Sequence, residues 1–409
     1  MPSRQKALCG AKTIRGGNCS NYMDTCPHPS HRRAAASADA SKPSASRPQT
    51  EVSAPNRPDP SSSTSAHKPK PPASGPERAT RPDGRALADD PSLLSEMCGR
   101  ASDHYGLAPA LIEADYWLIR TLGAWMHSLG ANGLPVPYRP AGRAASAGRI
   151  VFGGGTALSA AWNISDRWSE DIDLLLDPCG ELTSKRMRAA CKSQARRTCD
   201  AMGSRLRVLD TGPGYCFFES VHLASNQRTR VDVVARPLAA HASVLVQSRQ
   251  VFSLLGRIED QDVLDRYPEL GGFTVPVLGP GLTMTDKLLA QTQVSSSGDL
   301  ERIRERARDI YDLARIAKQR SRFAGHIGRD TRRLLHVSES QRHTGAPRRP
   351  RDGFASLRTF DPSTPEHEAL AAGYETVLTQ MVWGEKIPLD EAIRLIIALD
   401  EGPAEEHTE

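Results

Sequence analysis

A glycine-rich turn followed by two closely spaced aspartates constrains the fold of this chain more than any other feature. Residues 153–158 read GGGTAL, and residues 169–174 read SEDIDL. The first pattern is typical of a turn that opens a helix. The second is typical of a strand, in which alternate residues face opposite sides of a sheet. We therefore expect Asp171 and Asp173 to project together from one face, while the apolar residues between and after them enter a core.

This pair of carboxylates and the glycine turn together predict nucleotide chemistry. Two neighbouring carboxylates repel each other unless a cation neutralises them, and Mg²⁺ prefers such oxygen ligands. Backbone N–H groups at the start of a helix attract phosphate. Gly154, Gly155 and Thr156 are therefore the predicted phosphate-binding positions.

The 409-residue chain divides into segments of different composition. Residues 34–88 are mostly Ser, Pro, Ala and Arg, and no aromatic residue lies between Tyr22 and Tyr105. Such a segment cannot bury a core, so we predict a disordered linker. The net charge of +5 favours polyanionic partners only weakly. No apolar run of ~18 residues predicts a membrane span, no secretory signal is evident, and the expected location is the cytoplasm.

The order of the predicted elements indicates an α+β fold, a mixed sheet with helices followed by a helical C-terminal part. A helix should begin near Pro91, and residues 244–254 fit either a strand or a helix. The other predicted helices span 110–129, 156–162, 183–202, 283–293, 299–319, 366–382 and 389–399. The predicted strands span 150–152, 172–176, 205–209, 215–221 and 230–234. Ordered parts are expected over 89–281 and 282–409, with a basic loop at 320–358.

The sequence resembles the AbiEii/AbiGii family of nucleotidyltransferase toxins in four motifs that occur in the same order. These are IEADYW at 112–117, FGGGTAL with RWSEDIDL at 152–174, TDKLLA at 285–290 and RDIYDL at 308–313. The resemblance implies a polymerase-beta-like nucleotidyltransferase fold that uses Mg²⁺ and an NTP. It also implies an RNA acceptor, expected to be tRNA, and a cognate antitoxin. One departure is Ala114, where the family often has lysine.

The resemblance also implies roles for individual residues. Asp171 and Asp173 would hold Mg²⁺, and the Ser169 hydroxyl is expected on the same strand face. A third carboxylate is expected, for which Asp232 is the candidate and Glu219 a weaker alternative. Asp232 would otherwise be an exposed strand residue paired with its neighbouring arginine.

Two helical residues complete the predicted site. Lys287 is expected to contact the nucleotide phosphates, and the alternative is a lysine on a helix surface. Asp309 would either hold Lys287 in place or act as a base, and the alternative is an ordinary helix salt bridge.

The N-terminal 33 residues hold a compact cysteine cluster that resembles a small Cys3His zinc knuckle. Three thiolates and an imidazole suit tetrahedral Zn²⁺, and metal would have to fold so short a segment. A disordered tail with incidental cysteines is the alternative, and His28 is the alternative to the last ligand. The predicted ligands are Cys9, Cys19, Cys26 and His31.

The sequence thus predicts a nucleotidyltransferase toxin that modifies RNA, inhibits translation and growth, and is neutralised by an antitoxin. Two other functions remain open. One is a nucleic-acid-binding or scaffold protein on an inactive nucleotidyltransferase frame. The other is nucleotidyl or phosphoryl transfer onto protein. The basic loop at 320–358 would bind RNA phosphates or simply be solvated.

Overall fold

The computed structural model describes the chain from residue 86 to residue 401 with six internal gaps. The described ranges are 86–129, 134–135, 146–178, 183–223, 225–236, 246–321 and 348–401. They all belong to one compact unit, Glu77–Glu409. The predicted zinc ligands Cys9, Cys19, Cys26, His28 and His31, nearly all of the predicted linker and most of the basic loop lie outside the described residues.

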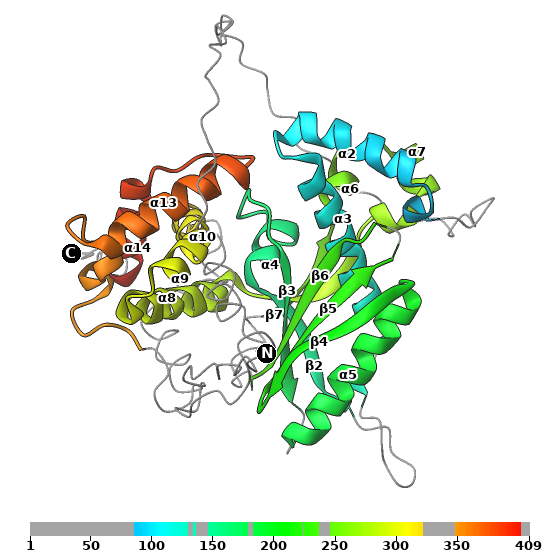
Figure 1. Cartoon of the computed structure of the whole chain (residues 1–409), viewed down its shortest axis with the longest axis horizontal. Coiled ribbons are helices and arrows are strands. Elements are labelled where there is room, and N and C mark those ends of the chain that lie inside the picture. Colours follow the sequence, from blue (N-terminus) through cyan, green and yellow to red (C-terminus); the bar gives the residue numbers. More distant parts are fainter. Residues whose placement is uncertain are drawn as a thin grey trace, which may run out of the picture. The chain divides into compact units, whose positions relative to one another are not determined.

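A mixed eight-stranded sheet forms the centre of this unit (Figure 1). Its strand order is β4-β5-β6-β3-β2-β8-β7, and β1 pairs with β2. The β3–β6 and β2–β8 pairs are parallel, and the other pairs are antiparallel. The strands are β1 (Leu134–Pro135), β2 (Ser146–Gly153), β3 (Asp171–Pro178), β4 (Ser204–Gly212), β5 (Tyr215–His222), β6 (Arg228–Ala235), β7 (Val246–Val251) and β8 (Phe273–Leu278).

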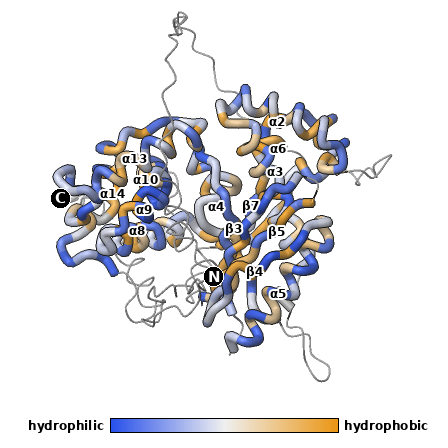
Figure 2. The backbone as a smooth tube through the Cα atoms, in the orientation of Figure 1, coloured by the Kyte–Doolittle hydropathy of each residue, from blue (hydrophilic) through white to orange (hydrophobic). Residues whose placement is uncertain are grey.

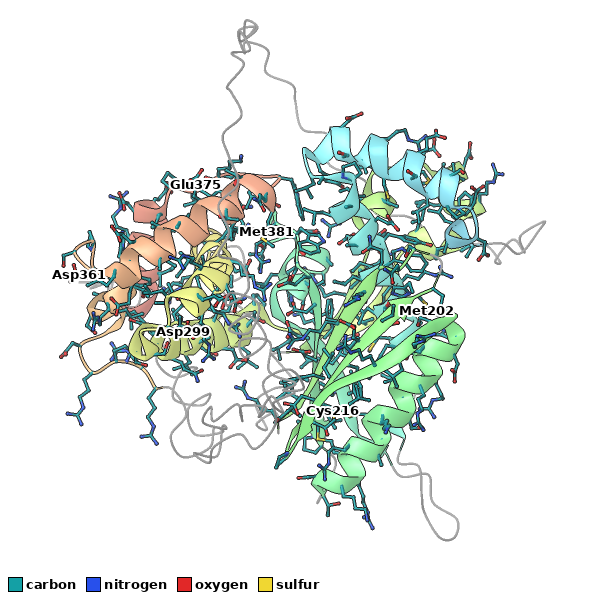
Figure 3. All side chains as sticks on the ribbon, in the orientation of Figure 1. Met202, Cys216, Asp299, Asp361, Glu375 and Met381 are labelled. Atoms are coloured by element: carbon teal, nitrogen blue, oxygen red, sulfur yellow. The ribbon has the colours of Figure 1, made fainter. Side chains whose placement is uncertain are left out.

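Helices α3 (Pro109–His127) and α5 (Ser184–Ala201) cover one face of the sheet. The strict alternation of buried residues along β5 shows which face of the sheet these helices cover. Cys216, labelled in Figure 3, and Phe218 point into this layer and are fully buried. The Phe218 ring lies 6.2 Å from the Trp125 ring of α3. The other face is therefore left to the polar residues of the same strands.

The C-terminal part is helical and shares one hydrophobic core with the sheet. Within it, α10 packs against α8, α13 and α14. Figure 2 shows apolar and polar stretches alternating along both the strands and these helices, as expected for amphipathic elements. These helices are α8 (Pro280–Ser297), α9 (Leu300–Glu305), α10 (Ala307–Lys318), α13 (Pro365–Gln380) and α14 (Leu389–Glu401).

Shorter elements complete the described structure. Helix α4 (Gly154–Ala160) follows β2 directly, and α2, α3 and α6 form a second, smaller core. No helix in the described ranges is long and apolar enough to cross a membrane. The remaining elements are α2 (Pro91–Tyr105), α6 (Leu254–Ile258), α7 (Gln261–Arg266) and the 3-10 helices Leu87–Asp89, Pro268–Leu270, Phe354–Ser356 and Arg358–Phe360.

The α+β class with a mixed sheet and a helical C-terminal part is confirmed. The structure corrects one predicted helix, settles one open segment and adds the unpredicted strand β8. The helix predicted over 299–319 is two helices, because the backbone turns at Arg306 (φ −91°, ψ 2°). Residues 246–251 form a strand, which resolves the open choice for that segment. The four described cysteines, Cys98, Cys191, Cys199 and Cys216, are buried free thiols.

Candidate active site

Three carboxylates meet on the face of the sheet that α3 and α5 leave open. The alternating burial of β3 turns Asp171 and Asp173 towards this face, as the sequence predicted. Because β6 runs parallel to β3 in register, Asp232 lies directly opposite Asp173. One oxygen from each of the three carboxylates lies within 4.8 Å of the others. Asp232, rather than Glu219, is thus the residue that the fold brings to the aspartate pair.

The electrostatics of this triad favour a bound cation. Burial, reinforced by the charges of Asp171 and Asp232, raises the pKa of Asp173 to about 8. Burial also raises the pKa of Asp232, although Arg230 opposes this. A divalent cation would relieve the repulsion. The spacing of the oxygens and the all-oxygen donor set fit Mg²⁺.

Asp232 also pairs with a neighbouring arginine. The Nε and Nη2 atoms of Arg230 donate to the two carboxylate oxygens of Asp232, both at 2.7 Å. Asp232 therefore combines the two arrangements that the sequence left open, triad member and partner of Arg230. Glu219 instead accepts from Arg207 at 3.2 Å and lies opposite Arg230, two residue pairs away from Asp232 along the sheet.

The turn lies so close to the triad that glycine is required in it. Gly154 has φ +71°, and a Cβ at this position would lie 1.7 Å from Oδ2 of Asp173. Gly155 lines a cavity beside the triad. The predicted phosphate contact of Thr156 is less direct, because its side chain is buried and its hydroxyl donates to the carbonyl of Asp171 at 2.5 Å. The threonine thus fastens the turn to β3.

Ser169 lies just before β3 rather than within it, so its expected position on the strand face is wrong. The side chain is nonetheless buried beside the glycine turn. A Cβ added to Gly155 would lie 3.2 Å from Oγ of Ser169. Both residues line the same cavity as Asp171, so the serine belongs to the site by another route.

Lys287 is held between two aspartates of α10. Its ammonium pairs with Asp309 and lies 2.9 Å from Oδ2 of Asp312. Only 12 % of the lysine side chain is exposed, so the alternative of a surface lysine is wrong. Burial lowers the pKa of Lys287, but the two aspartates outweigh it and keep the ammonium charged.

Asp309 forms an ion pair with Lys287, and this pairing bears on the two roles predicted for it. Burial raises its pKa, but the charges of Lys287 and Arg306 bring it below the ordinary value. A carboxylate with a depressed pKa is a poor proton acceptor near neutral pH. Of the two roles left open by the sequence, the electrostatics favour the first.

Two buried residues of this network, Arg167 and Asp312, were not predicted. Arg167 donates to Asp312 from Nε at 2.9 Å and from Nη2 at 2.5 Å, and Ser165 Oγ adds a third bond at 2.7 Å. Neither charged side chain is more than 1 % exposed. The spacing of Asp309 and Asp312 on one helix face was the available signal, but nothing in the sequence pairs the second aspartate with an arginine so far away.

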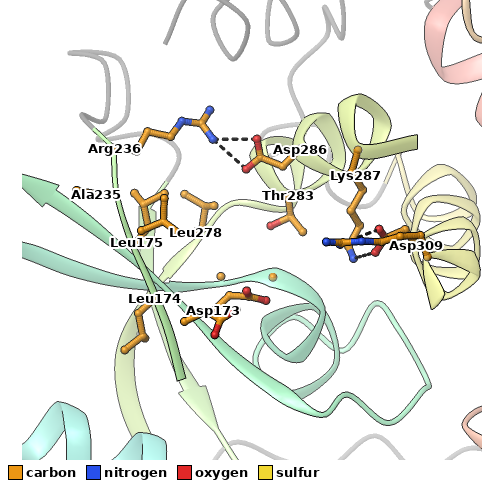
Figure 4. Close-up of a pocket in the computed structure, with 16 residues that line it drawn as sticks. Asp173, Leu174, Leu175, Ala235, Arg236, Leu278, Thr283, Asp286, Lys287 and Asp309 are labelled. Atoms are coloured by element: carbon orange, nitrogen blue, oxygen red, sulfur yellow. Dashed lines mark hydrogen bonds and ion pairs between the residues drawn. The ribbon is translucent and has the colours of Figure 1, made fainter. Parts of the chain in front are cut away.

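Two cavities meet at the triad and share Asp173, Asp232 and Lys287. The smaller, of about 440 Å³, has apolar walls that include Leu175 and Leu278. Figure 4 shows it, with Arg236 donating to both oxygens of Asp286 at 2.8 and 2.9 Å. The larger, of about 770 Å³, is polar. It is lined by several basic residues: Arg167, Arg230, Lys287, Arg304, Arg306 and Arg308.

The first motif of the sequence contributes to packing. Asp115 accepts a hydrogen bond at 2.6 Å from the backbone N–H of Leu254, which starts α6. Burial raises the pKa of Asp115 to about 6. The carboxylate thus anchors α6 to α3, and it lies outside the cavities described above.

Comparisons with known proteins identify the family. The family model described as "Nucleotidyl transferase AbiEii toxin, Type IV TA system" matches residues 138–393. A comparison with curated proteins finds no match. Among solved structures, JHP933 from Helicobacter pylori is similar with a TM-score of 0.35 and 10 % identity, covering 72 % of this chain and 92 % of that chain. The family match spans more than half of the chain, including the triad, Lys287 and Asp309. The chain belongs to the AbiEii family of nucleotidyltransferase toxins of type IV toxin–antitoxin systems.

Proposed function

We propose that the chain is a Mg²⁺-dependent nucleotidyltransferase that transfers a nucleotide from an NTP to an RNA acceptor, expected to be tRNA. The observation that carries this proposal is the set of three mutually close carboxylates on β3 and β6, placed where two cavities meet a buried lysine. Phosphoryl-type transfer depends mostly on positioning and charge neutralisation, which is what such a site provides.

Asp171, Asp173 and Asp232 would hold the metal, which neutralises charge on the phosphates when it is bound. The charged ammonium of Lys287 would bind phosphate oxygens, with Asp309 fixing its position. The close backbone at Gly154 and Gly155 lets a polyphosphate approach the triad. Lys287 and the glycine turn would both orient the nucleotide before the transfer step.

Asp232 would also accept the proton of the attacking hydroxyl at a carboxylate oxygen. The larger cavity, with Arg306 and Arg308 on its wall, would accommodate the remaining negative charge of the substrates.

Incubation of the protein with Mg²⁺, total tRNA and NTPs labelled at either the α or the γ phosphate tests this proposal. Label from the α position should enter RNA, and label from the γ position should not. Asp171→Asn and Asp173→Asn should abolish transfer. Asp177→Asn, on the same strand but outside both cavities, should retain it. Equal transfer by all variants would contradict the proposal.

Separation of the products by size distinguishes the other acceptor. If α-label enters a protein band and not RNA, the enzyme modifies protein. The scaffold alternative holds if two results occur together. The wild-type protein transfers no label, and expression of a variant without Asp171 and Asp173 still arrests growth.

As a member of a toxin family, the chain is expected to block translation and growth unless an antitoxin is present. Expression of the wild type in a bacterial host should therefore arrest growth, and Asp173→Asn should relieve the arrest. Co-expression of the cognate antitoxin should restore growth. Growth arrest by the aspartate variant would separate toxicity from the proposed chemistry.

A further inference from the structure

The open half of the sheet beyond Asp232 has the chemistry of a surface for single-stranded RNA. We propose that β4, β5 and β6 bind the unpaired end of the RNA acceptor on this face, with Phe217 and Tyr215 stacking on its bases. This inference rests on the proposed function, because it assigns the acceptor of that reaction to a named surface. It extends the site over two strands that take no part in holding the metal.

The arrangement of the strands indicates the side from which the acceptor arrives. The glycine turn follows β2, and Lys287 lies on α8, which follows β8 on the far side of β2. Asp232 lies on the opposite side of β3. In phosphoryl transfer the attacking and leaving oxygens are roughly in line. If the leaving polyphosphate occupies the glycine and lysine side, the acceptor hydroxyl arrives over Asp232, from the direction of β5.

The register of the sheet places aromatic rings on that route. Phe217 lies directly opposite Asp232, and Tyr215 lies opposite Val234. Directly opposed residues of antiparallel strands have their Cβ atoms about 5 Å apart. Both rings are partly exposed, on the face opposite to the buried Phe218. Val234 is 42 % exposed, so the apolar character of the face continues past the rings.

The two rings are held in place before any ligand binds. Their centroids lie 4.9 Å apart with an interplanar angle of 30°. The Tyr215 hydroxyl donates to Oδ2 of Asp210 at 3.2 Å. The ring lies against β4 at Gly212, where an added Cβ would be 2.3 Å from the ring. Fixed aromatic rings on an open sheet are a recurrent means of stacking unpaired RNA bases.

Arginines on the same face complement the RNA backbone. Arg205 and Arg207 on β4 and Arg228 and Arg230 on β6 are all exposed. The acidic residues of these three strands on this face are Asp210, Glu219 and Asp232, of which Glu219 pairs with Arg207 and Asp232 with Arg230. The guanidinium of Arg230 lies 5.3 Å from the centre of the Phe217 ring. Alternating cationic and aromatic side chains are typical of single-strand binding surfaces and favour RNA over a protein acceptor.

A third cavity joins this face to the triad. It measures about 600 Å³, and its lining includes Arg228, Arg230 and Glu219 of this face together with Asp171 of the triad. Ala114, which stands where lysine is frequent in the family, also lines it. RNA bound on the sheet face would reach Asp171 along this cavity.

Binding of fluorescently labelled total tRNA and of a single-stranded RNA oligonucleotide to the full chain tests this inference by anisotropy. Phe217→Ala should weaken binding about tenfold, and Phe217→Tyr, which keeps a ring, should restore it. Arg228→Glu should weaken binding and reduce its salt dependence. Val208→Ala, an exposed apolar residue of β4 paired with the buried Phe218, should bind as the wild type does.

Steady-state transfer separates this inference from the proposed function. Phe217→Ala should raise KM for RNA and leave KM for the NTP unchanged. If RNA binding and KM are both unaffected by Phe217→Ala, or if the chain binds no RNA, the inference is overturned. RNA binding that depends on Phe217 without any nucleotide transfer would retain the surface and reject the enzyme. Transfer to a protein acceptor that depends on Phe217 would overturn the choice of RNA.

Discussion

At the scale of single residues, the site depends on close approaches that leave no room for change. Gly154 is the clearest case, since its backbone has φ +71° and its missing side chain is what allows Asp173 to occupy its position. The glycine was predicted to bind phosphate, and the structure adds a steric reason for it. The carboxylate and the turn are therefore one unit.

Gly154→Ala should abolish most nucleotide transfer, because the new Cβ would overlap Oδ2 of Asp173. A displacement of about 1 Å in a reacting group commonly costs about a hundredfold in rate. Gly203→Ala is the matched control, since Gly203 has φ +59° but no atom within 4 Å of the added Cβ. Alanine must adopt a positive φ at either position, so both variants carry the same backbone cost. Equal losses of transfer activity in the two variants would refute the steric argument.

The buried ion network around Asp312 should contribute strongly to stability. Asp312→Asn would leave Arg167 and Lys287 in the interior with their common countercharge removed. Loss of one partner of a buried pair typically costs about 3–5 kcal/mol, which urea unfolding would measure. The exposed Asp103→Asn on α2 should change the unfolding free energy by less than about 0.5 kcal/mol. A small change in the unfolding free energy of Asp312→Asn would mean that water enters the buried ion network.

At the scale of elements, the packing of α3 on the sheet buries a histidine. The His222 ring stacks on Trp117 with centroids 4.3 Å apart, and its Nε2 lies 3.1 Å from the Thr229 hydroxyl. Burial, with a smaller contribution from Arg120, lowers its pKa to about 4. The folded chain therefore keeps this histidine neutral at a pH where the unfolded chain protonates it.

This histidine should make stability depend on pH between about 6.5 and 4. Above this window both states are neutral and the full stability is present. As the pH falls through it, only the unfolded state gains the proton, so up to about 3 kcal/mol of unfolding free energy is lost. In His222→Gln the loss over this window should be smaller by that amount, whereas the exposed His104→Gln should follow the wild type. Parallel profiles for wild type and His222→Gln would contradict this account.

Most elements could be predicted from periodicity, and the exceptions have physical reasons. The strand β8 contains Pro276, a residue that argues against a strand, and it was not predicted. Its role as the parallel neighbour of β2 is decided by tertiary packing. The break at Arg306 was also missed, because the flanking segments share one apolar period and no glycine or proline marks the turn.

At the scale of the whole molecule, the site is assembled by contacts between distant segments. The segment before β3 contacts the segment that follows α13. Arg167 forms an isolated β-bridge with Val382, and the backbone N–H of Trp168 donates to the carbonyl of Met381 at 2.9 Å. Asp171, Asp173, Lys287 and Asp309 could be predicted from motifs, whereas Asp232 was a candidate that no motif supported. The Arg167–Asp312 pair could not, because a buried arginine leaves no periodic pattern in the sequence.

Mg²⁺ with an NTP should stabilise the whole described unit, because the ligands bind only the folded chain. At a hundred times Kd the expected gain is about 2.7 kcal/mol, visible as a higher Tm in calorimetry. The double variant Asp171→Asn with Asp173→Asn should lose this gain. Asp177→Asn should keep it. Equal stabilisation of the double variant would show that Mg²⁺ acts elsewhere.

Asp171, Asp173 and Asp232 are expected to act together, and Asp232 is the member with the least support from sequence alone. The most direct test is the initial rate of transfer from an α-labelled NTP to tRNA by Asp232→Asn, measured beside Glu219→Gln. We predict that Asp232→Asn loses about a hundredfold or more of the rate, while Glu219→Gln stays within a few-fold of the wild type. Wild-type rates for Asp232→Asn would contradict the account of the triad.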